Sequence, residues 1–332
     1  MHNRTYLKKI LLLIFLFTLT GISSAQQREN YKFLITSDIH TSFQLNQYNP
    51  VFYEMRRHTV GNADSLIRFY RTIPQKTDAD AVVITGDLID YYEAGLSGDS
   101  SALIANQIEQ FNALSAFCPV PLYLTLGNHD ITSYWINKAD SSRMTTQVYA
   151  DRARASWIRN VSVFKNGTYY AELIKVENTT YHFVFLDNGY SLRDGGRMID
   201  KTQLDWLQNQ MDKAGNDPVL LFFHIYFPVG DINGDSLCFR KDKALNWPGE
   251  KDCSSGLLKV LNEHKNIKAM FVGHQHNNVW EGINFPAGHK IYQVMTSTLD
   301  RSRNNWRMIE LLKDTVIISK PGSNEKEIEI KF

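Results

Sequence analysis

What this 332-residue sequence lacks already narrows the kind of protein it encodes. It holds only three cysteines, Cys118, Cys238 and Cys253, so at least one thiol has no partner within the chain. A Cys238–Cys253 pair would close a short loop in an oxidising compartment and leave Cys118 as a buried free thiol beside an apolar strand. The sequence also lacks an apolar run of the roughly 20 residues that a helix needs to cross a bilayer. We therefore expect no membrane span in the mature chain.

The first 25 residues differ from the rest of the chain. Basic side chains at Arg4, Lys8 and Lys9 precede an apolar run over residues 10–22, and Ser23-Ser24-Ala25 follows it. This order is typical of a cleavable export signal, whereas a membrane anchor would need a longer run. No cysteine lies near the cleavage point, so a lipid anchor there is not supported. The sequence predicts a signal peptide over 1–25, a secreted or periplasmic location, and a single domain over 26–332.

The chain has no excess of basic charge. It carries 36 Lys and Arg against 35 Asp and Glu, and the signal holds three of the basic residues and no acidic one, so the mature chain has 33 against 35, a net charge of −2. Proteins that bind polyanions through counterion release usually carry a basic excess or stripe. The charge disfavours nucleic acid as a partner and makes nuclease action the less favoured function.

Apolar strands alternate with amphipathic helical segments in the first half of the chain, the pattern of an α/β fold with a buried sheet. We predict a hairpin through Glu177-Asn178 in the middle, and a functional or disordered loop over 225–255, which is rich in Gly, Asp, Lys and Pro. The predicted helices lie around 62–70, 103–117, 201–213 and 257–264. The predicted strands are 31–36, 81–85, 122–126, 168–175, 180–186, 218–223, 267–272, 290–296, 306–312, 315–319 and 325–330.

Five polar clusters each follow one of these apolar strands. In α/β sheets the carboxyl ends of strands gather ligands, because the loops there converge on one crevice. The five clusters are Asp38-Ile39-His40, Gly86-Asp87, Gly127-Asn128-His129-Asp130, His224 and Gly273-His274-Gln275-His276.

The residue types in these clusters suit a pair of divalent metal ions. Asp, Asn and His offer oxygen and nitrogen ligands, and none of the clusters contains cysteine, which favours Mn, Fe, Zn, Co or Ni over a thiolate zinc site. The i,i+2 spacing in Asp38-Ile39-His40 and His274-Gln275-His276 puts both side chains on one side of an extended segment. Each cluster alone is common at a turn, so the metal interpretation depends on the order and completeness of all five.

The ordered series D-x-H, G-D, G-N-H-[DE], H and G-H-x-H resembles the metallophosphoesterase superfamily, also called calcineurin-like phosphoesterases. The blocks span residues 38–276. The resemblance implies a metallo-dependent phosphatase-like fold, a four-layer sandwich of two mixed β-sheets flanked by helices. It also implies two divalent metal ions as cofactors and a small phosphoester as the substrate.

Carried over by motif, each candidate residue receives a role. Asp38, His40 and His276 would hold one metal, Asn128, His224 and His274 the other, and Asp87 would bridge them. A hydroxide bridging two such cations would attack a phosphate mono- or diester, because the cations lower the pKa of the water and neutralise the phosphate oxygens. The resemblance makes His129 the general acid for the leaving group, with Asp130 orienting it.

Departures from the motifs of known subfamilies narrow the choice of subfamily. Ser/Thr protein phosphatases carry G-D-x-x-D-R-G, but here Tyr91 stands where that pattern has its phosphate-gripping arginine. Purple acid phosphatases lack a histidine in the first block and have a tyrosine where this chain has Asp90. Cyclic-nucleotide or sphingomyelinase-like phosphodiesterases are the alternative activity, and a binding protein with a vestigial site is the less favoured one. Tyr226 and Phe227 either stack on substrate or pack in the core.

Overall fold

The computed structural model describes residues 28–44, 53–54, 56–90, 101–131, 147–189, 199–227, 253–300 and 305–332, without the side chains of 101–106, 147–149 and 253–255. The predicted export signal, most of the predicted 225–255 loop, Cys238 and the Cys253 side chain lie outside the described residues. None of the helices in these ranges combines the length and the apolar character that a bilayer span requires.

The described strands form two mixed sheets of six strands each. The first sheet has the order β12-β11-β10-β1-β2-β3, with β1 Tyr31–Thr36, β2 Ala81–Thr85, β3 Leu122–Thr125, β10 Arg307–Leu311, β11 Thr315–Ser319 and β12 Lys326–Lys331. The second has the order β4-β5-β6-β7-β9-β8, with β4 Tyr170–Val176, β5 Thr179–Phe185, β6 Val219–Phe222, β7 Ile267–Val272, β8 Val279–Phe285 and β9 His289–Met295.

The strands that carry the polar clusters are parallel within each sheet. In the first sheet β1 pairs in parallel with β2, and β2 with β3. In the second sheet, β5, β6, β7 and β9 form consecutive parallel pairs. The edge strands β4 and β8 pair antiparallel with β5 and β9. Parallel strands end at the same edge of a sheet, so the clusters after β1, β2, β3, β6 and β7 are brought together.

Alternating side chains divide the strands into layers. In β1, Phe33 and Ile35 point into the core between the two sheets, whereas Leu34 packs on the opposite side against the helices. In β6, Leu220 and Phe222 likewise face the core between the sheets, and Leu221 faces the second helical layer. Successive side chains of these strands point to opposite faces of the sheet, and both faces are buried. The face of each sheet that does not contact the other sheet must therefore be covered by helices.

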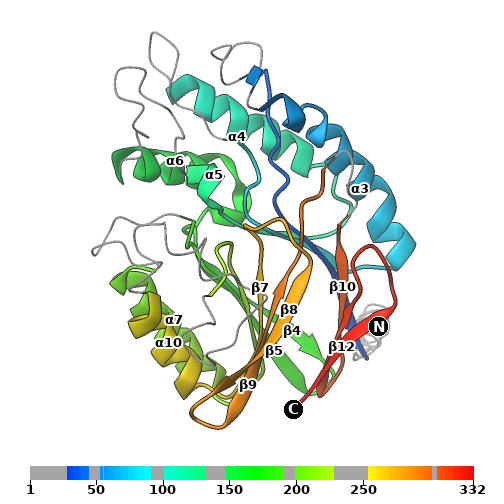
Figure 1. Ribbon diagram of the computed structural model, residues 1–332, viewed down its shortest axis with the longest axis vertical. Helices are drawn as coiled ribbons and strands as arrows, with labels where there is room; N and C mark the ends of the chain where they lie inside the picture. Colours follow the sequence, from blue (N-terminus) through cyan, green and yellow to red (C-terminus); the bar gives the residue numbers. More distant parts are fainter. Residues whose placement is uncertain are drawn as a thin grey trace, which may run out of the picture.

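Two helical layers complete a four-layer sandwich (Figure 1), as predicted. α3, α4 and α6 pack on the first sheet, and α7 and α10 pack on the second. The helices are α3 Asn62–Thr77, α4 Ser101–Ser115, the single turn α5 Asn128–Ile131, α6 Gln147–Asn160, α7 Lys201–Ala214 and α10 Cys253–Glu263. Short 3-10 helices lie at η2 Arg57–Thr59 and η3 Ser162–Phe164.

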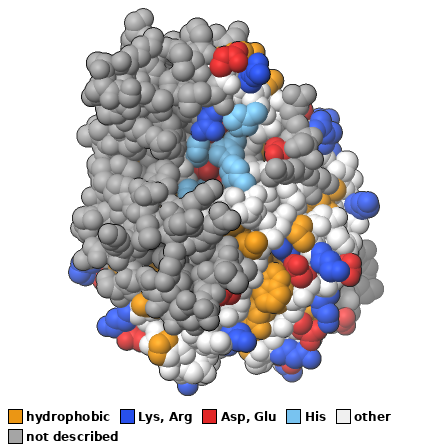
Figure 2. Space-filling model, viewed as in Figure 1, with side chains coloured by type: hydrophobic (Ala, Val, Ile, Leu, Met, Phe, Trp, Pro, Cys, Tyr) orange, Lys and Arg blue, Asp and Glu red, His pale blue; other side chains and the backbone are white. Residues whose placement is uncertain are grey.

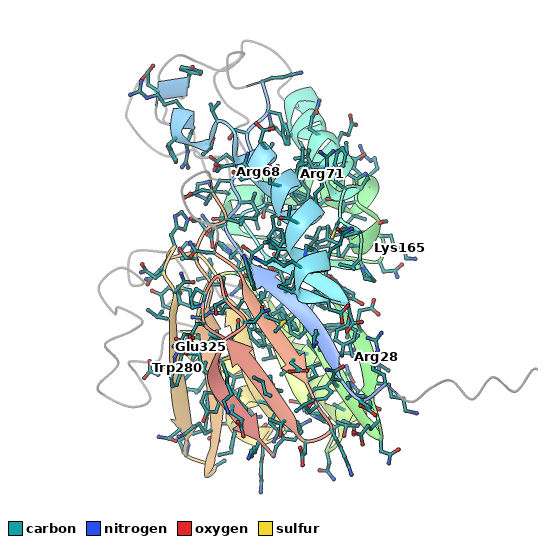
Figure 3. All side chains as sticks on the ribbon, turned by 90° about the vertical axis from the view of Figure 1, so that its right-hand side faces the viewer. Arg28, Arg68, Arg71, Lys165, Trp280 and Glu325 are labelled. Atoms are coloured by element: carbon teal, nitrogen blue, oxygen red, sulfur yellow. The ribbon has the colours of Figure 1, made fainter. Side chains whose placement is uncertain are left out.

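Helix α3 illustrates how an amphipathic segment covers the first sheet. Leu66, Phe69 and Tyr70 are buried against the sheet, while Arg68 and Arg71 lie on its outer face (Figure 3). The helix runs to Thr77, beyond the predicted end near residue 70, and it accommodates Pro74 in its last turn. A proline there removes only one N–H, and the turn ends at Asp78 in a left-handed conformation.

The predicted strands are all present, with boundaries that differ by at most two residues, and Glu177-Asn178 joins β4 and β5 as a hairpin. The strand β8, the helix α6 and the short turns α5, η2 and η3 were not predicted. Cys118 is a free thiol, as predicted, and it packs partly buried against the helix-covered core of the first sheet. Burial raises the pKa of its thiol to about 11.

Candidate metal centre

All five polar clusters meet at one edge of the sandwich. On the surface, histidine side chains gather in a hollow beside a Lys or Arg side chain (Figure 2). Backbone hydrogen bonds hold the loops together: Asp38 N donates to Gly86 O at 3.0 Å, and His40 N donates to Asp87 O at 2.8 Å. Gly273 N donates to His224 O at 3.0 Å in the same way. The convergence expected from strand ends is confirmed.

The backbone of this site is unusual, because many of its residues adopt a left-handed conformation. Eight described residues other than glycine have a positive φ, and five of them are candidate ligands: Asp38, His40, Asp87, His274 and His276, at 53°, 48°, 51°, 78° and 55°. This conformation is costly for residues with a Cβ, at roughly 1–3 kcal/mol each, and it persists only where the surroundings impose it. Such strain commonly clusters where function requires a fixed geometry.

The first group of candidate ligands surrounds Asp38 and His40. His276 Nε2 lies 3.2 Å from Asp38 Oδ1 and 3.1 Å from His40 Nε2. His40 Nε2 lies 3.6 Å from Asp87 Oδ2. Asp38 and His40 are buried, whereas the His276 side chain is 43% exposed and lies at the mouth of the site. Burial would raise the pKa of Asp38, but the His276 and His224 imidazoles outweigh it and lower that pKa to about 2.

The second group surrounds Asn128 and His224. Asn128 Oδ1 lies 3.0 Å from His224 Nε2 and 2.8 Å from His274 Nδ1. His224 Nε2 also lies 3.1 Å from Asp87 Oδ2, so Asp87 takes part in both groups. Burial and the nearby His224 lower the pKa of His274 to about 3, which keeps this imidazole neutral and able to donate a lone pair.

The chemistry of these groups fits a bound cation. His224 Nδ1 donates to the Thr85 carbonyl at 2.7 Å, so its Nε2 faces the oxygens of Asp87 and Asn128. Burial would lower the pKa of His224, but the Asp87 and Asp38 carboxylates outweigh it and raise that pKa to about 9. Without the Nε2 proton, three acceptors would point at one another and repel unless a metal ion lay among them. Carboxylates act on His40 in the same way. Burial would lower the pKa of His40, but Asp90, Asp87 and Asp38 outweigh burial and raise it to about 9. The site thus favours positive charge.

Glycines let the loops approach these side chains closely. A Cβ at Gly127 would lie 2.2 Å from Asp87 Oδ1, and one at Gly273 would lie 2.6 Å from Asp38 Oδ2. Neither distance is possible for a real Cβ, so both positions require glycine. This agrees with the expectation that a glycine before a candidate ligand lets the backbone approach the site.

His129 lies at the same edge but has a different partner from the one predicted. His129 Nδ1 donates to Asp90 Oδ1 at 2.7 Å, and His40 Nδ1 lies 2.9 Å from the same oxygen. The carboxylate of Asp130 instead accepts backbone N–H groups, from Leu88 and Ile89 at Oδ1 and from Gly127 at Oδ2. The predicted role of Asp130 as the residue that orients His129 is therefore wrong, because its oxygens hold the loops in place. Asp90 contacts His129.

Two functional residues were not assigned a role from the sequence. Asp90 appeared there only as a departure from a purple acid phosphatase pattern, although it lies three residues after Asp87. Asn188 is buried after β5, where its Oδ1 accepts His224 N at 3.0 Å and Ile225 N at 3.1 Å, and its Nδ2 donates to Ile225 O at 2.7 Å. A polar cluster after an apolar strand, Asp187-Asn188, was the signal that could have identified it.

Tyr226 and Phe227 pack in the core. Their exposed fractions are 2% and 1%, and both belong to the cluster beneath α7 and α10. Tyr226 accepts a hydrogen bond from Gln275 at 2.8 Å. Of the two interpretations of these aromatic side chains, packing is confirmed and stacking on substrate is excluded by their burial.

Comparisons with known proteins agree with the fold and the motifs. The chain is similar in fold to a dimetal phosphatase from Danio rerio, with a TM-score of 0.57 and 16% identity, covering 91% of this chain and 99% of that one. The sandwich is thus that of the metallo-dependent phosphatases. A family model for calcineurin-like phosphoesterases matches residues 31–278. The chain therefore belongs to the calcineurin-like phosphoesterase family.

Two further similarities involve purple acid phosphatases. The chain is 24% identical over 292 residues to "Probable inactive purple acid phosphatase 28" from Arabidopsis thaliana, covering 74% of this chain and 70% of the relative. It is also similar in fold to a purple acid phosphatase from yellow lupin (Lupinus luteus) seeds, with a TM-score of 0.53 and 12% identity, covering 91% of this chain and 53% of that one.

Proposed function

We propose that this protein hydrolyses phosphate esters at a pair of divalent metal ions. In this proposal Asp38, His40 and His276 hold one ion, and Asn128, His224 and His274 hold the other. The observation that carries it is the position of Asp87. Its carboxylate belongs both to the group with Asp38, His40 and His276 and to the group with His224 and His274, and within each group the ligand atoms lie within 4.8 Å of one another. One carboxylate shared by two groups is the arrangement that a bridged pair of ions needs.

When bound, two such ions would supply positive charge for the phosphate oxygens and lower the pKa of a coordinated water. The residues of the chain supply the rest. Asp90 holds the Nδ1 side of His129, which fixes the ring and leaves Nε2 on its other side. Burial lowers the pKa of His129 against the opposing effect of Asp87 and Asp90, so its imidazolium is a strong acid that can pass the Nε2 proton to the departing alkoxide or phenoxide. His129 is 14% exposed, so a substrate in the hollow can reach it.

The substrate in this proposal is a small phosphate monoester or diester. The nearly balanced charge of the chain supports a small substrate over a nucleic acid. A phosphodiesterase of the cyclic-nucleotide or sphingomyelinase-like type is the alternative within the same chemistry. We also propose that the protein is exported, on the basis of its basic and apolar first 25 residues.

The competing function is a binding protein with a vestigial site, and the name of the Arabidopsis relative includes the word inactive. Against it, all seven candidate ligands are present and converge, with a carboxylate shared between two groups. Hydrolysis of bis(p-nitrophenyl) phosphate separates the two functions. The proposal expects turnover that requires added Mn and disappears after metal removal by a chelator. The absence of turnover on a monoester, a diester, a cyclic nucleotide and a phosphocholine lipid, each with Mn, would support the vestigial site.

A further inference from the structure

The site contains an arginine that the sequence motifs do not predict. Arg56 lies just before η2, in a segment far from the G-D block, and its guanidinium reaches the hollow. Its Nη2 lies 3.2 Å from His129 Nδ1, and its Nε lies 3.6 Å from Asp90 Oδ2. Its side chain is 20% exposed, whereas the Asp90 side chain is fully buried. A cationic side chain therefore sits where the interior of the site meets the solvent.

A guanidinium at this position suits a phosphate group. It carries five N–H donors in a planar fork that matches phosphate oxygens. The Nη2 group of Arg56 faces His129, and its Nε group faces Asp90.

The charges at the site indicate which phosphate ester it would select. Asp38, Asp87 and Asp90 contribute three carboxylates, and these together with the attacking hydroxide would balance the charge of two divalent ions, so Arg56 adds one positive charge to the site. A phosphate monoester carries close to two negative charges near neutral pH, whereas a diester carries one. The positive charge of Arg56 therefore attracts a monoester more strongly than a diester.

We propose that Arg56 binds a terminal phosphate oxygen of the substrate and that the enzyme consequently prefers phosphate monoesters. This inference rests on the proposed function, because it names the substrate class of the same site. The competing role for Arg56 is purely structural, as the residue that holds Asp90 beside His129. The two roles differ in one measurable respect: a structural arginine affects monoesters and diesters alike.

The test compares Arg56→Ala with Arg57→Ala, a control at the neighbouring residue. Arg57 is 67% exposed and pairs with Glu54 at 3.2 Å, so its loss removes a surface charge. For Arg56→Ala we expect kcat/KM on p-nitrophenyl phosphate to fall about 10- to 100-fold, with a fall below about 3-fold on bis(p-nitrophenyl) phosphate. Arg57→Ala should leave both values unchanged. Equal losses on the two esters in Arg56→Ala would overturn the proposal.

Two further measurements keep the test decisive. Arg56→Lys retains a charge but loses the fork, so it should recover part of the monoester rate if Arg56→Ala folds poorly. Calorimetric binding of inorganic phosphate to the Mn-loaded chain should weaken about 10-fold in Arg56→Ala and stay unchanged in Arg57→Ala. Unchanged phosphate affinity in Arg56→Ala would overturn the proposal. If the wild type hydrolyses neither ester, the proposed function fails, while the phosphate affinities still decide the role of Arg56.

Discussion

The core between the two sheets and the site at their edge are built by the same strands in opposite ways. Phe33 and Ile35 of β1 lie fully buried in the core, and Asp38 and His40 follow a few residues later in left-handed conformations. The core consists of apolar side chains in regular extended backbone. At the site, acceptor groups face one another and the backbone is strained. One region therefore stabilises the protein, and the other uses part of that stability to hold a reactive geometry.

This contrast means that substitutions in the two regions should have separable effects. A change in the core should reduce stability and leave the chemistry of the folded protein intact. A change at the site should remove chemistry from a protein that still folds, because the apolar core between the sheets is left intact.

The largest effect is expected for Asp87→Asn. Asp87 is shared by both candidate groups, so this variant should lose bound metal and at least about 10³-fold in kcat, as expected when a paired buried charge is removed. Its amide oxygen can still accept the 2.8 Å hydrogen bond from His129 N. The variant loses the carboxylate whose pKa the His224, His129 and His40 imidazoles hold well below its usual range against the effect of burial. We therefore expect the metal-free variant to fold with a lower Tm than the wild type. Elemental analysis, kinetics and thermal melting check this, and full metal occupancy would contradict the assigned ligand role.

Phe183→Ala changes the core and leaves the residues of the site in place. The Phe183 ring is fully buried, 5.1 Å from both Phe33 and Phe222 between ring centroids. Its removal should lower the free energy of unfolding by about 3–5 kcal/mol, because a large cavity opens. Metal content and kcat, measured well below the Tm, should match the wild type. Loss of metal at a temperature where the variant is folded would show that the core and the site are not separable.

His129→Ala should affect the chemistry without affecting the metals. We expect kcat to fall by about 10²-fold on alkyl phosphate esters, whose alkoxide needs a proton to leave. The fall should be much smaller on p-nitrophenyl esters, because their leaving group is acidic. The ratio of the two rates is the measurement, with metal content as the control. Equal losses on both kinds of ester would argue against His129 as the general acid.

Asn188→Ala should have the smallest effect and should act on one half of the site. Its side chain holds the backbone at His224 and Ile225, and its loss leaves buried N–H groups unpaired. We expect the affinity for the ion held by Asn128, His224 and His274 to fall about 10- to 100-fold, as for other residues that orient ligands. Metal titration followed by elemental analysis should find one ion lost before the other. Simultaneous loss of both ions would indicate a general structural role.

The sequence was sufficient to predict most of the fold, since the buried strands have strong apolar patterns. Strand β8 was missed because it is an edge strand with mixed polarity, in which Trp280 is 39% exposed (Figure 3) and Gly282 interrupts the pattern. Helix α6 was missed because, among its described side chains, the fully buried ones are the small residues Ala150 and Ala153 and one large apolar residue, Trp157. Weak patterns of this kind become regular structure only through tertiary packing.

The candidate ligands were predictable for a related reason, since each directly follows an apolar strand and those strands are parallel. Contacts between separate loops were not predictable. The contact of Asp90 with His129, and that of Arg56 with both, depend on how these loops fold over the strand ends. Asp130 was assigned to His129 by the family resemblance, but the short helical turn directs its carboxylate toward Leu88, Ile89 and Gly127 instead.

In the proposed function, two metal ions held by one shared carboxylate make this protein a phosphoesterase. The direct measurement is the rate of bis(p-nitrophenyl) phosphate hydrolysis as Mn is titrated into the metal-free chain, with the bound metal determined by elemental analysis at each point. The claim predicts that hydrolysis is absent without metal and reaches its maximum at about two ions per chain. Binding of two ions without hydrolysis, or hydrolysis in the metal-free chain, would contradict it.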